Sequence, residues 1–538
     1  KRGIYYIGKN SEGVMEYDGK NWKKIPYETD NFSGVLLVAS YCANPPVITL
    51  PIGVEGNYRI FVGLYGEFGF NCGVQIKLKS EKYFSPLFVR NSNSTGESIY
   101  EVFWKDADLT GEAIEFAPFN KKDTDGFNSG IAYIKLVPVK PQKFCHEKPD
   151  IYLAGFIDAY SFIYYTCPTA KTQIQQQIEM FRDTPFKKIY WGMAAGDVAT
   201  YPTKVGSEPR VNLEVYPRAG DKNYAQSYRI FKNKNLDILK IALEHAKKIG
   251  LEFHVYHRLG FVAGQPPWEE MMYSKFFYQN QKFLCYDRDG MKISRLSYAY
   301  PEVQQHCIEL YKEVASCGID GINFAFHRGV PLVLFEKPII EEFKKKYGED
   351  PRKIPEADER LFEFRSNIIT GFINKVRQQF PGLELSATVL INEANNRFYN
   401  LDIKTWIEKK IIDVLIPYPQ DRGLPHRGII DMDYFSCLTA NTTCQLCPEL
   451  RAIRSWMTVY QHYYDLANYF YKYDIDGICF WDIDARFIFP EEWKIINQLH
   501  RKKGLKKRIY GVRDNFKKVP LKTLNGYAAN RYPFWWAY

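Results

Sequence analysis

Polar side chains follow several short apolar runs in the last two thirds of the sequence. His327, Arg328 and Glu336 come after the apolar run 319–326, and Glu449 comes after the run 442–447. Carboxylate, imidazole, guanidinium and indole groups are side chains that acid–base hydrolysis and the binding of sugar rings require. The positions of these residues therefore predict a hydrolytic site assembled from several loops.

Carboxyl groups are the residues on which such a site would depend. Cleavage of a glycosidic bond needs one carboxylic acid that protonates the leaving oxygen and a second carboxylate that attacks the sugar or activates water. We predict the catalytic groups among Glu336, Glu393 and Glu449. The predicted substrate-binding residues are Asp158, Trp191, Asp197, His257, Arg258, His327, Arg328, Asn392, Tyr418, Asp421, Trp481, Asp482 and Asp484.

A metal-dependent hydrolase is an alternative, because such enzymes place His and Asp on several strands. The first apolar run, however, is followed by Asp158 and carries no histidine. His254 and His257 are three residues apart, so on a strand they face opposite sides. We therefore expect His254 to be a packed core residue, and we predict no metal ion.

The elements that would position these residues alternate between strand and helix. Helical patterns lie between the apolar runs, most clearly at 236–248, 303–315 and 360–379. The runs with the composition of buried parallel strands are 151–157, 188–193, 251–256, 319–326, 383–390, 411–417, 442–447 and 475–481. Eight such units predict a (β/α)8 barrel, in which functional residues lie at the carboxyl ends of the strands.

A doubly wound open sheet is the competing fold. It usually carries a glycine-rich phosphate loop after its first strand, and the sequence has no such loop after residues 151–157. We therefore predict the barrel, and we predict no cofactor.

Residues 1–143 have a different pattern from the rest of the chain. Short strand-like runs are separated by Gly, Asn, Asp and Pro, and no long helical period intervenes. This pattern predicts an N-terminal β-sandwich domain. A proline-punctuated linker at 138–149 leads into the barrel domain, 144–504. The tail, 505–538, is basic and aromatic, and we expect it to pack on one of the domains.

The composition of the chain indicates which classes of ligand and partner to expect. Aromatic residues make up 16% of the 538 residues, which favours a ligand with flat faces such as sugar rings. The net charge of +10 comes without a nucleic-acid-binding motif, so we predict no nucleic-acid partner and keep an acidic polymer open as a substrate. No apolar run is long enough to span a membrane. The chain begins at Lys1 rather than Met, which leaves open whether a leader has been removed, and a secreted or periplasmic location is favoured over a cytoplasmic one.

The stretch between Asp320 and Arg365, DGINFAFHRGVPLVLFEKPIIEEFKKKYGEDPRKIPEADERLFEFR, resembles bacterial family 10-like glycosyl hydrolases. The segments WGMAAGDVATYPTKVG, DLTG and YIKLVPV are similar to the same group, so the resemblance extends over nearly the whole chain. The resemblance implies a (β/α)8 barrel and a glycoside hydrolase that acts on an oligo- or polysaccharide. It leaves the sugar and the oligomeric state open.

One position departs from that group. Its members often carry an aspartate on the fourth strand, just before the aromatic residue and the arginine, where this chain has Ala325. If that aspartate is catalytic in the group, this chain uses another carboxylate or is a carbohydrate-binding protein without activity. The largest clan of barrel glycosidases places its carboxylates after strands four and seven. That analogy pairs Glu336 with Glu449 and leaves Glu393 as the replacement for Glu336.

Overall fold

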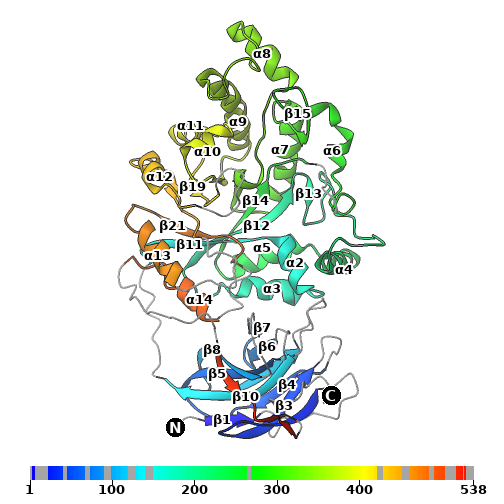
Figure 1. Cartoon of the computed structure of the whole chain (residues 1–538), viewed down its shortest axis with the longest axis vertical. Helices are drawn as coiled ribbons and strands as arrows, with labels where there is room; N and C mark the ends of the chain where they lie inside the picture. Colours follow the sequence, from blue (N-terminus) through cyan, green and yellow to red (C-terminus); the bar gives the residue numbers. More distant parts are fainter. Residues whose placement is uncertain are drawn as a thin grey trace.

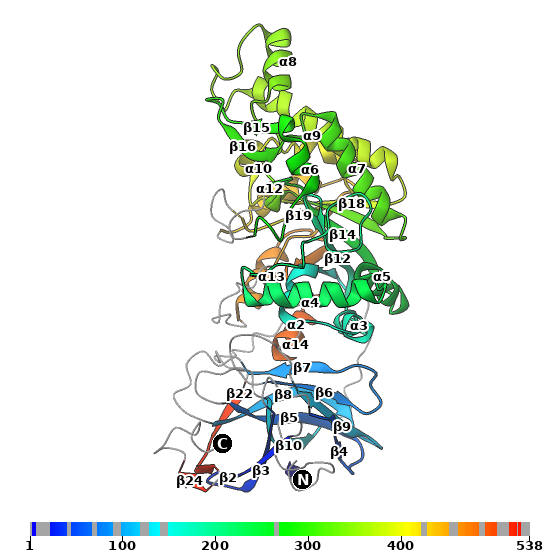
Figure 2. The same cartoon turned by 90° about the vertical axis from the view of Figure 1, so that its right-hand side faces the viewer.

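Three regions follow one another along the long axis of the molecule (Figure 1). Antiparallel sheets form one end, and a barrel of parallel strands with surrounding helices forms the middle. The other end contains the segments 284–296 and 337–347, and we call this region the excursion (Figure 2). The structure is a computed structural model that describes residues 3–6, 22–39, 45–66, 73–89, 98–118, 129–139, 149–262, 268–420, 428–450, 461–483, 490–502, 516–524 and 526–528.

The first region consists of two antiparallel sheets. Its strands are β1 (Gly3–Tyr6), β2 (Lys23–Glu28), β3 (Ser33–Ala39), β4 (Ile48–Pro51), β5 (Asn57–Gly66), β6 (Gly73–Leu78), β7 (Ser85–Phe88), β8 (Ser98–Asp108), β9 (Ala113–Pro118), β10 (Ser129–Pro138), β22 (Phe516–Pro520), β23 (Thr523–Leu524) and β24 (Tyr527–Ala528). The larger sheet has the order β22-β8-β5-β10-β3-β2-β23-β24, with β1 paired to β10. The smaller sheet has the order β4-β9-β6-β7.

The two sheets share one apolar core. β4 alternates buried and exposed residues, as a strand with one solvent-facing side does. Val62 and Val102 of the larger sheet are buried in the same cluster as Val74 and Ile76 of the smaller sheet. This packing agrees with the predicted N-terminal β-sandwich.

The C-terminal tail completes the larger sheet of this sandwich. β22 pairs antiparallel with β8, and β23 pairs antiparallel with β2. Leu521 and Leu524 are buried in a cluster with Ile25 and Tyr27 of β2. The described part of the tail therefore packs on the N-terminal sheets, although the whole barrel lies between the two in sequence.

Eight parallel strands form the barrel in their order along the chain. They are β11 (Tyr152–Ile157), β12 (Phe186–Ala195), β14 (Glu252–Arg258), β17 (Gly321–Ala325), β18 (Glu384–Val389), β19 (Val414–Pro417), β20 (Gln445–Leu446) and β21 (Gly477–Phe480). β11 pairs with β12 on one side and with β21 on the other, which brings the first and last strands together. Each strand overlaps one of the eight predicted runs, and the predicted (β/α)8 barrel is confirmed.

The pairing between β20 and β21 closes the barrel with few hydrogen bonds. The N–H of Cys479 donates to the carbonyl of Pro448 at 3.0 Å, and the N–H of Leu450 donates to the carbonyl of Cys479 at 2.8 Å. Glu449 is thereby paired with Cys479 in the parallel sense. Closure at this point places Glu449 beside the end of β21.

Helices, short strands and 3-10 turns connect the barrel strands. The helices are α2 (Ala159–Thr166), α3 (Lys171–Glu179), α4 (Ala219–Asn233), α5 (Ile238–Lys248), α6 (Lys275–Gln279), α7 (Pro301–Ala315), α8 (Lys337–Tyr347), α9 (Glu359–Gln379), α10 (Glu393–Phe398), α11 (Ile403–Glu408), α12 (Met432–Thr439), α13 (Gln461–Phe470) and α14 (Pro490–Ile496). Shorter elements are β13 (Val198–Ala199), the hairpin β15 (Leu284–Tyr286) and β16 (Lys292–Leu296), and the 3-10 turns η1 (Gln281–Phe283) and η2 (Phe326–Arg328). Within the described ranges, none of these helices has the length and apolar character needed to cross a membrane.

Local signals fix several helix ends. Asp237 begins α5 by accepting hydrogen bonds from the N–H groups of Leu239 and Lys240 at 2.9 and 3.2 Å. Gly348 ends α8 with φ 75°, a left-handed conformation that favours glycine. Asp158 caps α2 in the same way as Asp237 caps α5, and it also follows β11 directly. The first predicted site residue is therefore held where a strand ends and a helix begins.

Candidate active site

Aromatic rings fill the barrel interior near the carboxyl ends of the strands. Phe156 stacks on Tyr190 with ring centroids 4.4 Å apart, and it stacks on Trp481 at 4.7 Å. Tyr256 lies 5.0 Å from Trp481. The same buried cluster contains Ala154, Ala325, Val414, Ile416, Tyr418, Cys447 and Cys479. Since alternate residues of a strand point to the same side, these side chains form a floor beneath the strand ends.

Trp481 lies at the centre of this floor, directly after β21. The ring of His327 meets it edge-on at 4.6 Å, and the ring of Tyr418 meets it edge-on at 5.7 Å. His327 in turn stacks on Tyr418 at 4.1 Å with an interplanar angle of 29°. Trp481 is 2% exposed, so its indole packs as part of the core rather than as an open stacking face.

Asp158 and Arg258 form an ion pair above the floor. The Nη2 of Arg258 donates to Oδ2 of Asp158 at 2.6 Å. Burial opposes ionisation of Asp158, but the Arg258 guanidinium and hydrogen bonds from Ser161 and the N–H of Tyr160 outweigh it and hold its pKa below the ordinary value. Asp158 is therefore an ionised carboxylate whose oxygens already have donors.

Glu449 is the carboxylate that follows β20. It is buried, and its Oε1 accepts a hydrogen bond from the backbone N–H of Trp481 at 2.9 Å. Its own N–H donates to the carbonyl of Pro417 at 3.0 Å. The side chain is thus fixed between the ends of three neighbouring strands.

Asp482 is a further carboxylate at this end of the barrel, and like Glu449 it is buried. It follows Trp481 and has φ 52°, a left-handed conformation that Asp adopts more readily than most residues. Its charge acts on the neighbouring groups, because it contributes to raising the pKa values of Tyr256 and Arg258. Residues held in such conformations are often found at functional sites.

Arg328 is the exposed residue of the group. The turn η2 follows β17 and presents His327 to the floor and Arg328 to solvent. The Cζ of Arg328 lies 5.7 Å from the centre of the Trp481 ring. We call the following set the barrel mouth: Asp158, Tyr256, Arg258, His327, Arg328, Tyr418, Glu449, Trp481 and Asp482.

Two predicted site residues lie on the outer wall of the barrel. Trp191 packs against Phe162 of α2 and Phe253 of β14. His257 accepts from the hydroxyl of Tyr311 at its Nδ1 and donates from its Nε2 to the carbonyl of Gly196, at 2.9 and 2.6 Å. Burial lowers the pKa of His257 to about 4, although its hydrogen bond to Gly196 opposes this. It is therefore neutral, and neither residue takes part in the mouth.

Asp197 belongs to a separate buried group at the turn between β12 and β13. Its Oδ2 accepts from the hydroxyl of Ser207 at 2.8 Å, and its Oδ1 accepts from the hydroxyl of Ser274. The Nε2 of His306 lies 3.9 Å from Oδ2. These contacts join the β12–β13 turn to α6 and α7, which is a structural arrangement.

Glu336 lies directly before α8. Both of its carboxylate oxygens lie 3.0 Å from the N–H of Leu334, which donates to them. Burial raises its pKa, although that N–H and nearby Cys285 and Ser297 lower it in part. All of these partners belong to the excursion that contains β15, β16 and α8, so the structure does not bring Glu336 to the mouth.

Glu393 and Asn392 lie at the start of α10, after β18. Asn392 accepts from the N–H of Asn395 at 2.9 Å and thereby begins the helix. Glu393 is exposed, and its charge acts on Arg397 and Tyr434 rather than on the residues of the mouth. Asp421 and Asp484 lie outside the described residues.

Tyr256 and the rings of Phe156 and Tyr190 were not among the predicted residues. The signal that identifies them is alternation on the strands: Tyr190 precedes the outward-facing Trp191, and Tyr256 precedes the outward-facing His257. His254 has the parity of Tyr256, and its ring lies inside the barrel, 5.2 Å from that of Tyr190. It is buried, as a packed core histidine is.

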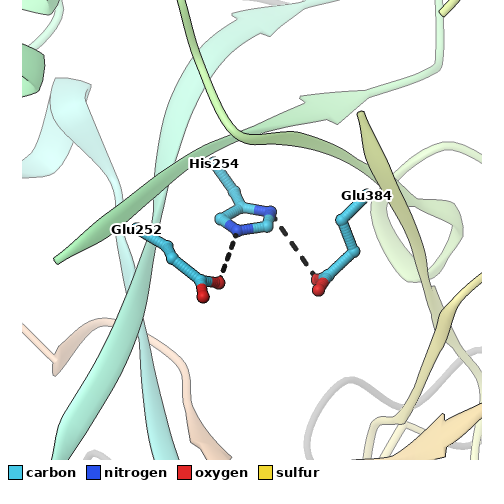
Figure 3. A group of neighbouring side chains, drawn as sticks. All are labelled: Glu252, His254 and Glu384. Atoms are coloured by element: carbon cyan, nitrogen blue, oxygen red, sulfur yellow. Dashed lines mark hydrogen bonds and ion pairs between the residues drawn. The ribbon is translucent and has the colours of Figure 1, made fainter. Parts of the chain in front are cut away.

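The opposite end of the barrel interior holds the group that could bind a metal. Figure 3 shows His254 between Glu252 and Glu384, with its Nε2 3.4 Å from Glu252 and its Nδ1 3.7 Å from Glu384. The Nζ of Lys188, however, lies 2.6 Å from both oxygens of Glu384 and 3.5 Å from Glu252. A metal ion would have to displace this ammonium group, so the residues fit a metal poorly.

The comparison with known families concerns the barrel. The family model described as "Glycosyl hydrolase-like 10" matches residues 154–420, about half of the chain. Residues 154–420 of the barrel belong to the glycosyl hydrolase-like 10 family. The resemblance seen in the sequence is confirmed for these residues, whereas Glu449 and Trp481 of the glycosyl hydrolase-like barrel lie beyond the matched range.

Solved structures with similar folds include several glycosidases. The α-galactosidase TtGalA from Thermus thermophilus is 8% identical with a TM-score of 0.39, over 89% of this chain and 95% of that chain. A β-galactosidase from Halorubrum lacusprofundi is 9% identical with a TM-score of 0.40, over 65% and 57%. The glycoside hydrolase domain of PelA from Pseudomonas aeruginosa is 14% identical with a TM-score of 0.29, over 46% and 84%. No curated protein matches the chain.

Proposed function

We propose that the protein is a glycoside hydrolase that cleaves an oligo- or polysaccharide at the barrel mouth. The observation that carries the proposal is the position of Glu449. This buried carboxyl group is held by the N–H of Trp481 at the carboxyl end of a barrel from a glycosyl hydrolase-like family. Burial is one way in which glycosidases keep the carboxyl group of a general acid protonated.

The second carboxylate of the pair is Asp482 in this proposal. Asp482 and Asp158 both lie at the mouth, but Asp158 is held by Arg258, Ser161 and the N–H of Tyr160. A carboxylate with this many donors is a weak nucleophile and a weak base. Asp482 follows Trp481 directly, so it lies next to the residue that holds Glu449.

The original candidates Glu336 and Glu393 rank below this pair. Glu336 has its partners in the excursion, and Glu393 is exposed at the start of α10. Neither lies among the residues of the mouth, so Glu393 serves as the control in the experiment.

The test is a screen of neutral and acidic glycans for released reducing ends, followed by kinetics on any substrate found. Glu449→Gln and Asp482→Asn should each lower kcat/KM by about 10²–10⁴-fold while circular dichroism shows an intact fold. Glu393→Gln is the matched control and should stay within about twofold of wild type, as expected for a solvated carboxylate without a catalytic role. Near-native turnover of Glu449→Gln would refute the assignment.

A carbohydrate-binding protein without activity is the second candidate, and Ala325 favours it. This residue ends β17 and is buried in the same interior cluster as Trp481 and Tyr418. An aspartate at this position, as the resemblance implies for related proteins, would therefore point into the interior beneath the mouth. Glycan binding without release of reducing ends by the wild type would favour this candidate.

A further inference from the structure

Exposure separates the acidic groups of the mouth from its basic groups. Glu449 and Asp482 are 1% and 5% exposed, and the side chain of Asp158 is 13% exposed. The side chain of Arg258 is 28% exposed, and Arg328 is open to solvent. Within the described part of the mouth, a ligand therefore meets guanidinium groups before it reaches a carboxylate.

The two guanidinium groups differ in their partners. Burial opposes the charge of Arg258, but Asp158, Tyr256 and Asp482 outweigh it and raise its pKa. Arg328 forms no ion pair and no hydrogen bond with any residue that the structure describes, and its contact is the face of Trp481. Many other exposed arginines hold a carboxylate of their own, as Arg352 holds Asp350.

This geometry determines which donors and ring faces of the mouth can bind a ligand. The guanidinium of Arg328 lies over the indole, a cation–π arrangement that orients the group and leaves its N–H donors available. The indole beneath it is too buried to stack on a sugar ring. The Nε1 of Trp481 is a further donor, and this one is buried; no acceptor contacts it among the described residues. Available donors and a covered ring face favour a ligand group that accepts hydrogen bonds.

We infer that the sugar bound at the mouth carries a carboxylate, as uronic acids do, and that Arg328 binds this carboxylate. The inference rests on the proposed function for the location of the sugar, and it adds the substrate class. A planar guanidinium can form two parallel hydrogen bonds to a carboxylate, which a neutral hydroxyl group cannot match.

The surrounding charge permits such a ligand. Among the described residues of the mouth, the formal charges of Asp158 and Asp482 balance those of Arg258 and Arg328, and Glu449 is a further carboxyl group. The net charge of +10 over the whole chain favours encounter with an acidic polymer. The anionic group is therefore not repelled at the mouth, and Arg328 supplies its direct partner.

The experiment measures binding to matched pairs of glycans by calorimetry. Polygalacturonate, alginate and hyaluronan are compared with the same polymers after chemical reduction of their carboxylates to alcohols, so that each pair differs in charge alone. The wild type should bind at least one acidic polymer about 10–100-fold more tightly than its reduced form, the range expected for charge-assisted hydrogen bonds.

Variants at Arg328 separate specific recognition from general attraction. Arg328→Gln should abolish the preference for the acidic polymer, and Arg328→Lys should retain part of it because the charge remains. Arg352→Gln, a change at an exposed arginine of the excursion, should leave the preference unchanged. Non-specific attraction by the basic chain would be affected equally by Arg328→Gln and Arg352→Gln.

The outcomes distinguish this inference from the proposed function. Arg328-dependent binding without release of reducing ends supports the inference and contradicts the glycosidase. Hydrolysis of neutral glycans that Arg328→Gln leaves unchanged supports the glycosidase and overturns the inference. Equal binding of acidic and reduced polymers, an unchanged preference in Arg328→Gln, or no binding of any acidic polymer also overturns it.

Discussion

The two ends of the barrel interior differ in which charged groups are buried and how these groups are paired. At the amino ends of the strands, Lys188 is fully buried and lies between Glu384 and Glu252, while His254 bridges the same two carboxylates. At the mouth the carboxylates are buried and Arg328 is exposed without a carboxylate partner among the described residues.

The difference shows which end is built for stability and which for a ligand. Burial alone would lower the pKa of Lys188, but Glu384 and Glu252 outweigh it and raise the pKa, so the lysine stays charged. A buried pair of this kind is costly to break, because removal of one partner leaves the other uncompensated. At the mouth, the guanidinium of Arg328 and the Nε1 of Trp481 have no acceptor among the described residues, as expected of a site that binds a ligand.

The largest expected effect on stability comes from removing the cation of the amino end. Lys188→Met should lower the free energy of unfolding by about 3–5 kcal/mol, because it leaves Glu384 without its ammonium partner. Denaturant unfolding of the purified protein measures the loss. The double variant Lys188→Met/Glu384→Gln should recover part of it, and binding of acidic glycans by the folded fraction should not change. A loss below about 1 kcal/mol would show that this network does not stabilise the barrel.

A somewhat smaller effect on stability comes from a buried histidine on β14, a strand that runs from one end of the barrel interior to the other. β14 supplies His254 to one end and Arg258 to the mouth, and between them His257 faces outward with a pKa of about 4. The unfolded chain binds a proton at His257 below about pH 6.5, whereas the folded chain does so only below about pH 4. His257 therefore contributes stability above pH 6.5 that is lost as the pH falls towards 4, about 3 kcal/mol in all.

The variant His257→Gln isolates this contribution. Unfolding free energies of the wild type and of His257→Gln are measured at pH 7.5 and pH 4.5. The decrease on acidification should be about 2–3 kcal/mol larger in the wild type, because glutamine does not titrate. Parallel decreases in both proteins would contradict a buried neutral histidine.

The smallest effect tests the amino end for metal. Because Lys188 already neutralises Glu384, zinc or a chelator should shift the Tm of the wild type by less than about 1 °C, since only a ligand that binds the folded state raises stability. Lys188→Met should gain a zinc-dependent increase in Tm, since Glu252, His254 and Glu384 then lack their internal cation. A zinc-dependent increase in the Tm of the wild type would contradict this difference between the two ends and favour a metal site.

The sequence by itself determined the barrel and the parity of its strands. Apolar runs of the length of buried strands, separated by helical patterns, placed all eight barrel strands, because burial on both faces demands near-continuous apolar residues. The same regularity separated His254 from His257, which are three residues apart and do face opposite sides of β14. It also carried the information that Trp191 faces outward, since Tyr190 is the residue with inward parity.

Only the tertiary structure decided which polar residues meet. Asp158 and Arg258 are 100 residues apart in sequence, and Glu449 contacts a backbone N–H 32 residues further along the chain. Glu336 and Glu449 both follow barrel strands, yet Glu336 is drawn into the excursion by hydrogen bonds within its own loop, whereas Glu449 is fixed by the closure of β20 on β21. Strand patterns depend on local burial and can be read from the sequence. The path of a long loop depends on contacts that exist only once the barrel has closed.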